Sequence, residues 1–345
     1  IRIHEFGDVD VLKWEDIEVG DPCPGELRVR HTVIGFNFLD IAVRRGLYPV
    51  LPELPSVLGT EAAAVVEAVG DGVTGIKAGD RVAYAATMPG AYAEARLIEA
   101  SQVVVLPDGV SDEIAAASML KGMTAEYLIH RCYPAQAGQT ALVHAAAGGV
   151  GLFLCQWLAA KGVNVIGTVG SDAKKETILA NGAAHAVNYK TENFQEVARE
   201  VTGGTGVDVV YDSVGKDHYE RSIDSLRPRG YMVNYGNASG PLPPIDSVEL
   251  NVKGSLFFTK ASMRFYQLTR EELENSVATL FDALAKGRCD DRDRPALQAR
   301  GCCHRPHRRG GGADDRLDRL HHLGAPFETI AARSPQGEAC FLSSC

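Results

Sequence analysis

The sequence predicts an α/β protein with two domains: a mainly β domain of partly open barrel type, followed by a doubly wound parallel sheet. Three observations support this fold class. Short β-branched runs separated by turn residues fill residues 1–118. From residue 119 onward, strand-like apolar runs alternate with helical patterns. Early in that alternation, residues 140–162 read as a strand, a small-residue turn and a helix without interruption.

Composition narrows the classes of function. The chain has 345 residues, of which 45% are hydrophobic and 23% charged, as expected for a globular protein of two domains. A formal net charge of −9 argues against a nucleic-acid-binding surface. No apolar run reaches the roughly 18–20 residues of a membrane span. The first six residues predict an edge strand and not a signal peptide. We therefore expect a cytoplasmic protein with neither a nucleic-acid nor a membrane partner.

The first domain is expected to cover residues 1–118. Alternating apolar and polar residues predict strands in it, and turn residues such as Gly70-Asp71-Gly72 and Pro107-Asp108-Gly109 separate them. The expected strands cover residues 27–33, 62–69, 81–84 and 103–106.

The second domain is expected at residues 119–260, entered through a helix capped at Ser111 and a second helix at 123–132. Its alternation predicts a parallel sheet with helices on both faces. Residues 261–288 are expected to form a segment that returns to the first domain. The predicted strands are 140–145, 163–168, 185–188, 207–211, 230–235 and 254–259, and the predicted helices are 149–161, 172–181, 193–201, 217–226 and 270–286.

The turn at residues 145–151 reads Ala-Ala-Ala-Gly-Gly-Val-Gly and resembles the dinucleotide-binding fingerprint. Ala146 stands where the first glycine of G-x-G-x-x-G belongs, and Gly148 and Gly151 are the other two. Glycine lets the backbone approach a pyrophosphate, and the start of the helix supplies free N–H groups. The alternative is a tight turn with only a structural role. Since a strand precedes the turn and a helix follows it, we expect a Rossmann domain that binds a dinucleotide.

The end of the second strand indicates which dinucleotide binds. An NAD enzyme carries an acid there for the ribose 2′-hydroxyl, whereas this chain reads Val169-Gly170-Ser171. Asp172 follows and is expected to cap the next helix. A 2′-phosphate is expected to contact Ser171, Lys174 and Tyr189, which favours NADP(H). The alternative is that Lys174 and Lys175 belong to a solvated helix face.

The tail from residue 289 to 345 differs from the rest of the chain. It has no lysine or tyrosine, and five of the eight cysteines crowd into it with arginine, histidine and glycine. One interpretation is a metal site, although the spacing suits a tetrahedral ion poorly. The others are a disordered basic tail and translation out of frame, which resequencing of the DNA at the codon for Arg288 distinguishes. The ligands of the first interpretation are Cys289, Cys302, Cys303, His304 and His307.

Several motifs together resemble one family. They are GFNFLD at 35–40, RGLYP at 45–49, LGTEA at 58–62, GDRV at 79–82, LKGMT at 120–124, HAAAGGVG at 144–151, YDSVG at 211–215 and GNASG at 236–240. From residue 1 to about 287 the chain resembles the zinc-free quinone oxidoreductases of the medium-chain dehydrogenase/reductase superfamily, the group that includes zeta-crystallin. The resemblance implies that the first domain is a GroES-like catalytic domain.

The resemblance also implies the site residues. Asn37, Asp40 and Lys121 flank the nicotinamide end of NADP(H), with Thr124 nearby. No metal is expected, because Asn37 stands at the position of a zinc ligand in relatives and Gly59-Thr60-Glu61 lacks the histidine of the other. The remaining cofactor contacts implied are Gly148, Gly149, Val150, Gly151, Gly170, Ser171, Lys174, Tyr189, Ser213, Gly236, Asn237, Phe258, Thr259 and Lys260.

Alternative interpretations exist for some of these residues. Lys121 reads alternatively as an exposed lysine at a helix start, and Asp40 and Glu61 as structural partners of Arg44 and Arg45.

The expected activity is hydride transfer from NADPH to a quinone, with Asn37 and Tyr48 as donors to the developing hydroquinone oxygen. Tyr48 reads alternatively as a packed loop tyrosine. Alternative functions are reduction of activated C=C bonds in enones or enoyl thioesters, and a non-catalytic, crystallin-like NADPH-binding protein. The family forms homodimers through sheet edges, which points to residues 254–259 as the seam.

Overall fold

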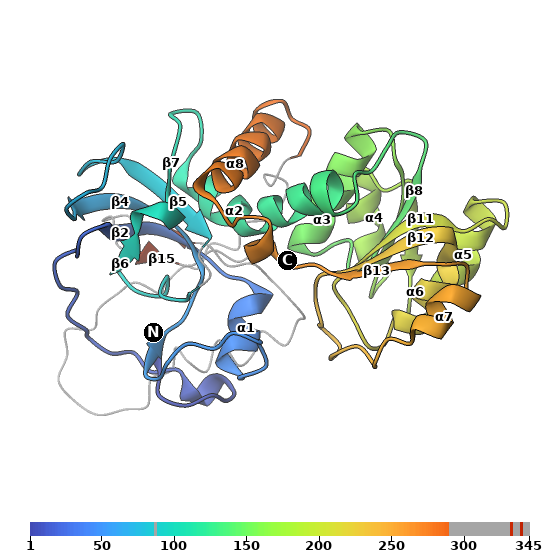
Figure 1. Ribbon diagram of the computed structural model, residues 1–345, viewed down its shortest axis with the longest axis horizontal. Helices are drawn as coiled ribbons and strands as arrows, with labels where there is room; N and C mark the ends of the chain where they lie inside the picture. Colours follow the sequence, from blue (N-terminus) through green and yellow to red (C-terminus); the bar gives the residue numbers. More distant parts are fainter. Residues whose placement is uncertain (86–87, 290–331, 334–338, 341–345) are drawn as a thin grey trace. The chain divides into compact units, whose positions relative to one another are not determined.

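The computed structural model describes residues 1–85, 88–289, 332–333 and 339–340 (Figure 1). Its contacts divide the chain into two compact units. The first contains Ile1–Leu120, and the second begins at Lys121 and runs to the end of the continuous described chain. The predicted metal, disordered and out-of-frame interpretations of the tail concern residues that lie almost entirely outside the described ones. The domain boundaries drawn from the sequence remain predictions.

The first unit is built on an antiparallel sheet in the order β15-β14-β2-β4-β5-β7, with β6 paired to β2. Its central strand β2 (Glu26–Gly35) pairs along its length with β4 (Glu61–Val69). A separate pair joins β1 (Arg2–Ile3) to β3 (Ser56–Val57), so the predicted N-terminal edge strand is present but short. The remaining strands are β5 (Arg81–Ala85), β6 (Ala95–Glu99), β7 (Val104–Val105), β14 (Ala332–Arg333) and β15 (Ala339–Cys340).

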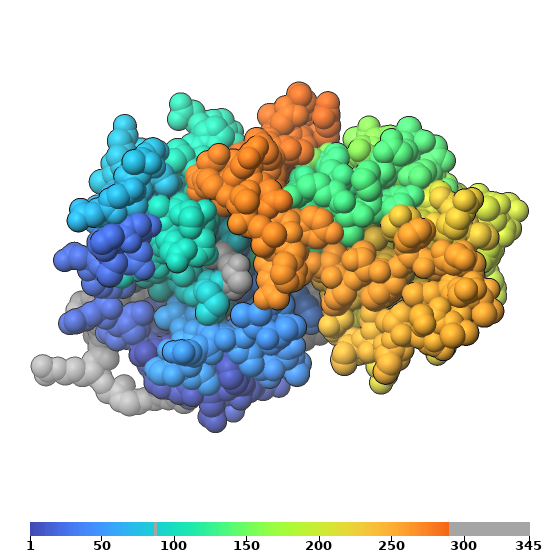
Figure 2. All heavy atoms as spheres, in the orientation of Figure 1, coloured from blue at the N-terminus to red at the C-terminus, as the bar shows by residue number. Residues whose placement is uncertain are grey.

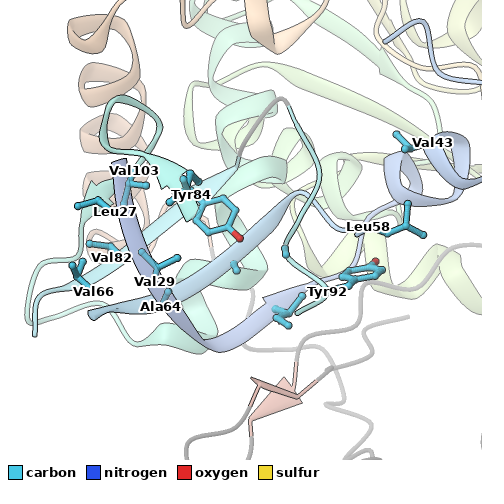
Figure 3. Packing of buried hydrophobic residues seen from close by; sticks show 14 of the residues in the cluster. Leu27, Val29, Val43, Leu58, Ala64, Val66, Val82, Tyr84, Tyr92 and Val103 are labelled. Carbon is cyan, nitrogen blue, oxygen red and sulfur yellow. The ribbon is translucent and has the colours of Figure 1, made fainter. Parts of the chain in front are cut away.

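The core of the first unit is formed mainly by side chains of this sheet, and helix α1 (Phe38–Arg44) contributes Val43 to it (Figure 3). Alternate residues of β2 and β4 enter it because successive side chains of a strand point to opposite faces. Short 3-10 turns at Val9–Val11 and Ala100–Gln102 complete the unit. The side chains labelled in Figure 3 are Leu27, Val29, Val43, Leu58, Ala64, Val66, Val82, Tyr84, Tyr92 and Val103.

The second unit is a six-stranded parallel sheet in the order β10-β9-β8-β11-β12-β13. Numbered within the unit, this is the order 3-2-1-4-5-6 of a dinucleotide-binding sheet, with the chain reversing between β8 and β11. The predicted doubly wound fold is therefore confirmed. The strands are β8 (Thr140–Val143), β9 (Asn164–Val169), β10 (His185–Asn188), β11 (Val207–Asp212), β12 (Leu226–Asn234) and β13 (Phe257–Lys260).

Helices cover both faces of this sheet. In Figure 1, α3 and α4 lie on one side of the strands, while α5, α6 and α7 lie on the other. Buried apolar side chains such as Leu142, Val210 and Ile223 fill the space between strands and helices. The helices are α3 (Gly149–Ala160), α4 (Ala173–Ala180), α5 (Phe194–Val201), α6 (Tyr219–Ser225), α7 (Ser247–Val252) and α8 (Arg270–Ala285), with a 3-10 turn at Met263–Phe265.

One prediction about the helices is wrong. Instead of two helices there is a single helix α2 (Asp112–Tyr127), continued by a π-helical turn at Leu128–Cys132. Gly122 lies within this helix without interrupting it. The position needs a glycine, because a Cβ there would lie 2.3 Å from Cδ1 of Leu280 in α8. The close packing of α2 against α8 therefore stabilises the helix at this position and outweighs the low helix propensity of glycine. The Ser276 hydroxyl of α8 also donates to the Glu126 carboxylate of α2 at 2.7 Å. These two contacts pack α8 against α2 within the second unit.

Candidate functional site

The turn between β8 and α3 leaves three backbone donors without a protein acceptor. Gly148 is the N-cap of α3 with extended dihedrals (φ −78°, ψ 171°), and its carbonyl accepts the N–H of Leu152 at 2.9 Å. Within the described residues, the N–H groups at positions 149–151 donate to no protein oxygen. Free N–H groups at a helix start attract an anion, and the helix dipole adds to that attraction. The residues present therefore fit a dinucleotide pyrophosphate.

The glycines of the turn have different roles. A Cβ on Gly151 would lie 2.3 Å from the Ala145 carbonyl oxygen, so this position admits no side chain. A Cβ on Gly148 would meet only that same oxygen, at 3.1 Å, and otherwise faces open space. The opening needed for a phosphate therefore lies at Gly148, while Gly151 is required by the fold itself.

Lys121 lies against this turn. A Cβ on Gly149 would be 2.5 Å from Cδ of Lys121, so the lysine stem covers the backbone there. Lys121 is 3% exposed and lies inside α2. The alternative of an exposed lysine at a helix start is therefore wrong, and a buried ammonium beside an anion-binding turn is a suitable partner for a phosphate or ribose oxygen.

The end of β9 gathers the residues predicted for a 2′-phosphate. A Cβ on Gly170 would lie 2.9 Å from the Tyr189 hydroxyl, so that hydroxyl sits over the strand end. Ser171 and Lys174 follow at the start of α4, both half-buried. Asp172 stands at the N-cap position but its side chain does not cap the helix; it accepts from Asn188 and Lys175 at 3.2 and 3.3 Å, which lowers its pKa.

The ends of β11, β12 and β13 meet in a second polar cluster. The loop at Gly236 is pressed onto Ser213, whose carbonyl oxygen would be 2.6 Å from a Cβ on that glycine. Lys260 donates to Asn234, to the Gly236 carbonyl at 3.2 Å and to Asn237 at 2.8 Å. Three acceptors match the three N–H bonds of an ammonium, so Lys260 anchors this loop.

Buried Asp212 completes the cluster. It accepts from the Asn234 amide at 2.7 Å, and burial raises its pKa. Phe258 and Thr259 lie half-buried on β13 beside the loop.

In the first unit, Asn37 lies in a network of two buried carboxylates. Its backbone N–H donates to Oδ2 of Asp40 at 2.8 Å, and its side-chain Nδ2 donates to Oε2 of Glu61 at 2.7 Å. Asp40 also accepts from the hydroxyls of Tyr92 at 2.8 Å and Thr60 at 3.1 Å. Burial, opposed by these hydrogen bonds, raises the pKa of Asp40 to about 6.

The proposed pairing of Asp40 and Glu61 with Arg44 and Arg45 is wrong. Both arginines donate to Asp8 instead, at 3.1 and 3.2 Å.

The other two predicted residues differ in setting. Tyr48 is half-buried, and its ring packs against the core of the first unit, in agreement with the packing alternative for the ring. Thr124, in the second unit, is buried in α2 with its hydroxyl 4.0 Å from the sulfur of Met263.

Among residues 1–85 and 88–289, no three His, Cys, Asp or Glu side chains form a group able to hold a metal ion. No helix among the described residues is long and apolar enough to cross a membrane.

Comparison with known proteins decides the family. Models of the alcohol dehydrogenase GroES-like domain and of the zinc-binding dehydrogenase match residues 23–131 and 149–281. A quinone oxidoreductase of Salmonella typhimurium is 47% identical over 287 residues, covering 83% of this chain and 88% of the relative. The crystal structure of Escherichia coli quinone oxidoreductase complexed with NADPH gives a TM-score of 0.81 at 46% identity, covering 84% of this chain and 88% of that one.

The chain belongs to the quinone oxidoreductases of the medium-chain dehydrogenase/reductase superfamily. The predicted family, its Rossmann and GroES-like fold class and its oxidoreductase character are thereby confirmed. A 2-haloacrylate reductase of Burkholderia is similarly related, with 47% identity over 290 residues that cover 83% of this chain and 87% of the relative.

Some polar residues of the two clusters described above were not predicted from the sequence. Thr60 and Asp212 entered only as parts of motifs, and Tyr92 and Asn234 not at all, because their contacts join segments 20 or more residues apart. The available signal was a polar residue inside or directly after an apolar strand, as in Val-Val-Tyr-Asp at 209–212. A charged or amide side chain at a strand end is either paired or functional.

The buried Asp40 makes stability depend on pH. Because its pKa is raised from 3.8 to about 6, the folded protein binds more protons than the unfolded chain between pH 4 and 6. The free energy of unfolding therefore falls as pH rises through this window. We expect Asp40→Asn to remove this slope, so that its stability relative to wild type rises by roughly 3 kcal/mol at most between pH 4 and pH 7.

Urea unfolding at both pH values measures this difference, with Asp71→Asn at an exposed position as the control. Parallel pH profiles for wild type and Asp40→Asn contradict the assignment.

Proposed function

We propose that this chain is an NADPH-dependent quinone reductase that passes hydride to a quinone without a metal. The observation that carries the proposal is the set of free N–H groups at residues 149–151, in a chain 47% identical to quinone oxidoreductases. Relatives of 46% and 43% identity, from Escherichia coli and a mycobacterium, have structures in complex with NADPH. NADP(H) is thus the cofactor, as the sequence predicted.

Lys174 is the residue best suited to select NADPH over NADH. Its neighbour Lys175 forms ion pairs with Asp172 and Glu192, whereas the Lys174 ammonium has no protein partner among the described residues. An ammonium left unpaired three residues after Ser171 supplies the charge that a 2′-phosphate requires. The solvated-face interpretation therefore suits Lys175 better than Lys174.

The protein's role in the chemical step is position and electrostatics. NADPH supplies the hydride when it is bound. Asn37 and Tyr48 are the donors that we propose for the quinone oxygen on which negative charge develops, because donors fixed beforehand stabilise such charge without reorganisation. Lys121, Thr124 and the loop at Ser213, Gly236 and Asn237 are proposed to hold the cofactor.

The absence of a metal is part of the proposal. Where zinc-dependent relatives place a ligand, this chain has Asn37, whose nitrogen donates to Glu61. A hydrogen-bonded amide nitrogen is not a zinc ligand, and Thr60 is committed to Asp40 at 3.1 Å.

A second candidate function is reduction of an activated C=C bond. The relative at 47% identity named 2-haloacrylate reductase favours it, as does the similarity to the CurK enoyl reductase, with a TM-score of 0.74 at 26% identity. Hydride transfer to an electron-poor C=C bond needs the same cofactor and a donor for the oxygen that gains charge. Both functions would use the same site, so only the substrate that the protein reduces faster distinguishes them.

Quinone-dependent oxidation of NADPH tests the function. We expect fast oxidation of NADPH with 1,2-naphthoquinone and slow oxidation with 2-chloroacrylate, because Asn37 and Tyr48 are proposed to stabilise the negative charge that develops on the quinone oxygen. Absorbance at the NADPH band measures both rates in parallel. Faster turnover of 2-chloroacrylate supports the second candidate. NADPH binding without turnover of either substrate contradicts both and supports the non-catalytic alternative.

Lys174→Ala tests the choice of cofactor. We expect KM for NADPH to rise by about 10-fold or more, the loss of one charge-assisted contact, with KM for NADH nearly unchanged. Lys175→Ala is the matched control, since its charge is paired within the protein. Equal effects of the two substitutions, or a loss shared by NADH, show that Lys174 does not contact the 2′-phosphate.

The proposal includes a cytoplasmic homodimer joined at residues 254–259. Within the described residues, β13 pairs only with β12, and Phe257 on it is 49% exposed. Figure 2 shows α7 and β13 at the surface of the second unit, and Val252 of α7 is 79% exposed. An open apolar edge of this kind is usually covered. We expect the mass of two chains in solution by light scattering; a monomer at micromolar concentration contradicts the seam.

A further inference from the structure

Glu61 is a buried acid to which no role has so far been given. It begins β4, and its side chain is inaccessible to solvent. Oε2 accepts the Asn37 side-chain N–H at 2.7 Å, and Oε1 accepts the backbone N–H of Leu120 in α2, also at 2.7 Å. Each oxygen thus faces a different donor, and one of these donors belongs to the residue proposed to act on the quinone.

The chain makes room for this acid. Gly35, the last residue of β2, lies so close that a Cβ would be 2.5 Å from Oε2 of Glu61 and 2.4 Å from the carbonyl oxygen of Ala116. Any side chain at position 35 would therefore displace the carboxylate or α2. A buried carboxyl group costs free energy unless its oxygens are hydrogen-bonded, and both oxygens of Glu61 accept a hydrogen bond.

The carboxylate determines which way the Asn37 amide points. Because Oε2 of Glu61 accepts a hydrogen bond from this amide, an amide turned the other way would place two oxygen acceptors face to face. The backbone of Asn37 is held as well, because its N–H donates to Oδ2 of Asp40 at 2.8 Å at the start of α1. These contacts leave the second N–H of Asn37 as the remaining donor among the described residues.

We propose that Glu61 is a positioning residue: it fixes the Asn37 amide so that the remaining N–H is offered to the oxygen of the bound quinone. The inference rests on the proposed function and adds to it a residue that sets the direction of the donor. Glu61 itself does not touch the substrate. Glu61 disfavours the flipped orientation of the Asn37 amide. In that orientation the amide oxygen, an acceptor, would face the quinone oxygen on which negative charge develops.

Glu61→Gln preserves the size of the side chain and reverses this preference. The Leu120 N–H still requires the one oxygen of the glutamine, so the glutamine amide nitrogen faces Asn37. Two amide nitrogens cannot pair as donors, and Asn37 turns its oxygen inward. We expect the single-turnover rate of NADPH oxidation by 1,2-naphthoquinone to fall on the order of 10²-fold, the cost of removing one oxyanion donor. The affinity for NADPH should stay within about 2-fold.

A double-mutant cycle with Asn37→Ala separates positioning from a structural role. If Glu61 acts through Asn37, Glu61→Gln has no further effect on the rate in the Asn37→Ala background. The matched control is Glu67→Gln on the same strand, whose carboxylate pairs with Arg28 and Arg30 at the surface, each at 3.1 Å. We expect this control to turn over at the wild-type rate.

Two results overturn the inference. They are losses that add in the double variant, and a wild-type rate for either single variant. The rate of the wild-type protein distinguishes the two failures. If it does not reduce the quinone, the proposed function fails; if it does and the variants give either of these results, only the inference about Glu61 fails.

The amide orientation is also measurable in the unaltered protein. With asparagine labelled by ¹⁵N, the side-chain signals of Asn37 are those missing from the Asn37→Ala spectrum. We expect one of its two protons to be shifted strongly downfield by the carboxylate and to exchange slowly. Two protons at the positions of a solvated amide overturn the proposal even where Glu61→Gln does not fold.

Discussion

Three backbone N–H groups at the start of α3 constrain the rest of the second unit. They remain without protein acceptors because Gly148 offers no capping side chain and the chain turns sharply at Ala145, where φ is +49°. Leaving such donors without a protein partner costs free energy that an anion recovers on binding. The buried Lys121 stem lies against this turn. The strand order places the end of β11 next to that of β8, so the polar cluster at the ends of β11 to β13 continues along the same edge of the sheet. This arrangement suits an extended dinucleotide.

Much of the second unit was predictable from sequence, because its signals are local. The turn at residues 145–151 and the alternation of strands and helices depend on neighbours within about ten residues, and each predicted strand was found within a few residues of its position. The continuous α2 was not predicted, since Gly122 is explained only by Leu280, more than 150 residues away. Helix α1, inside a segment expected to be β-rich, was missed for the same reason: its buried face meets distant strands.

The first unit shows the limit of residue-by-residue transfer. Resemblance implies that Asn37 and Asp40 are cofactor neighbours, which stays a prediction, and the structure adds that both oxygens of Asp40 accept from Thr60, Tyr92 and the Asn37 backbone. Asp40 therefore holds the loop that carries Asn37, and Glu61 holds its amide. In the second unit Lys260 similarly supports the loop at Gly236. In each unit, carboxylates or an ammonium thus hold a loop or side chain of the candidate site, and motifs alone do not reveal these contacts.

Amide hydrogen exchange at the turn tests the central claim that the N–H groups of Gly149, Val150 and Gly151 hold the cofactor. Exchange of this segment is compared with and without saturating NADPH, by mass spectrometry of a peptide that spans residues 145–155. The account predicts strong added protection at these three amides on binding, with little change at the exposed loop around Gly203 and Gly204. NADPH that binds tightly and leaves exchange at the turn unchanged would contradict it.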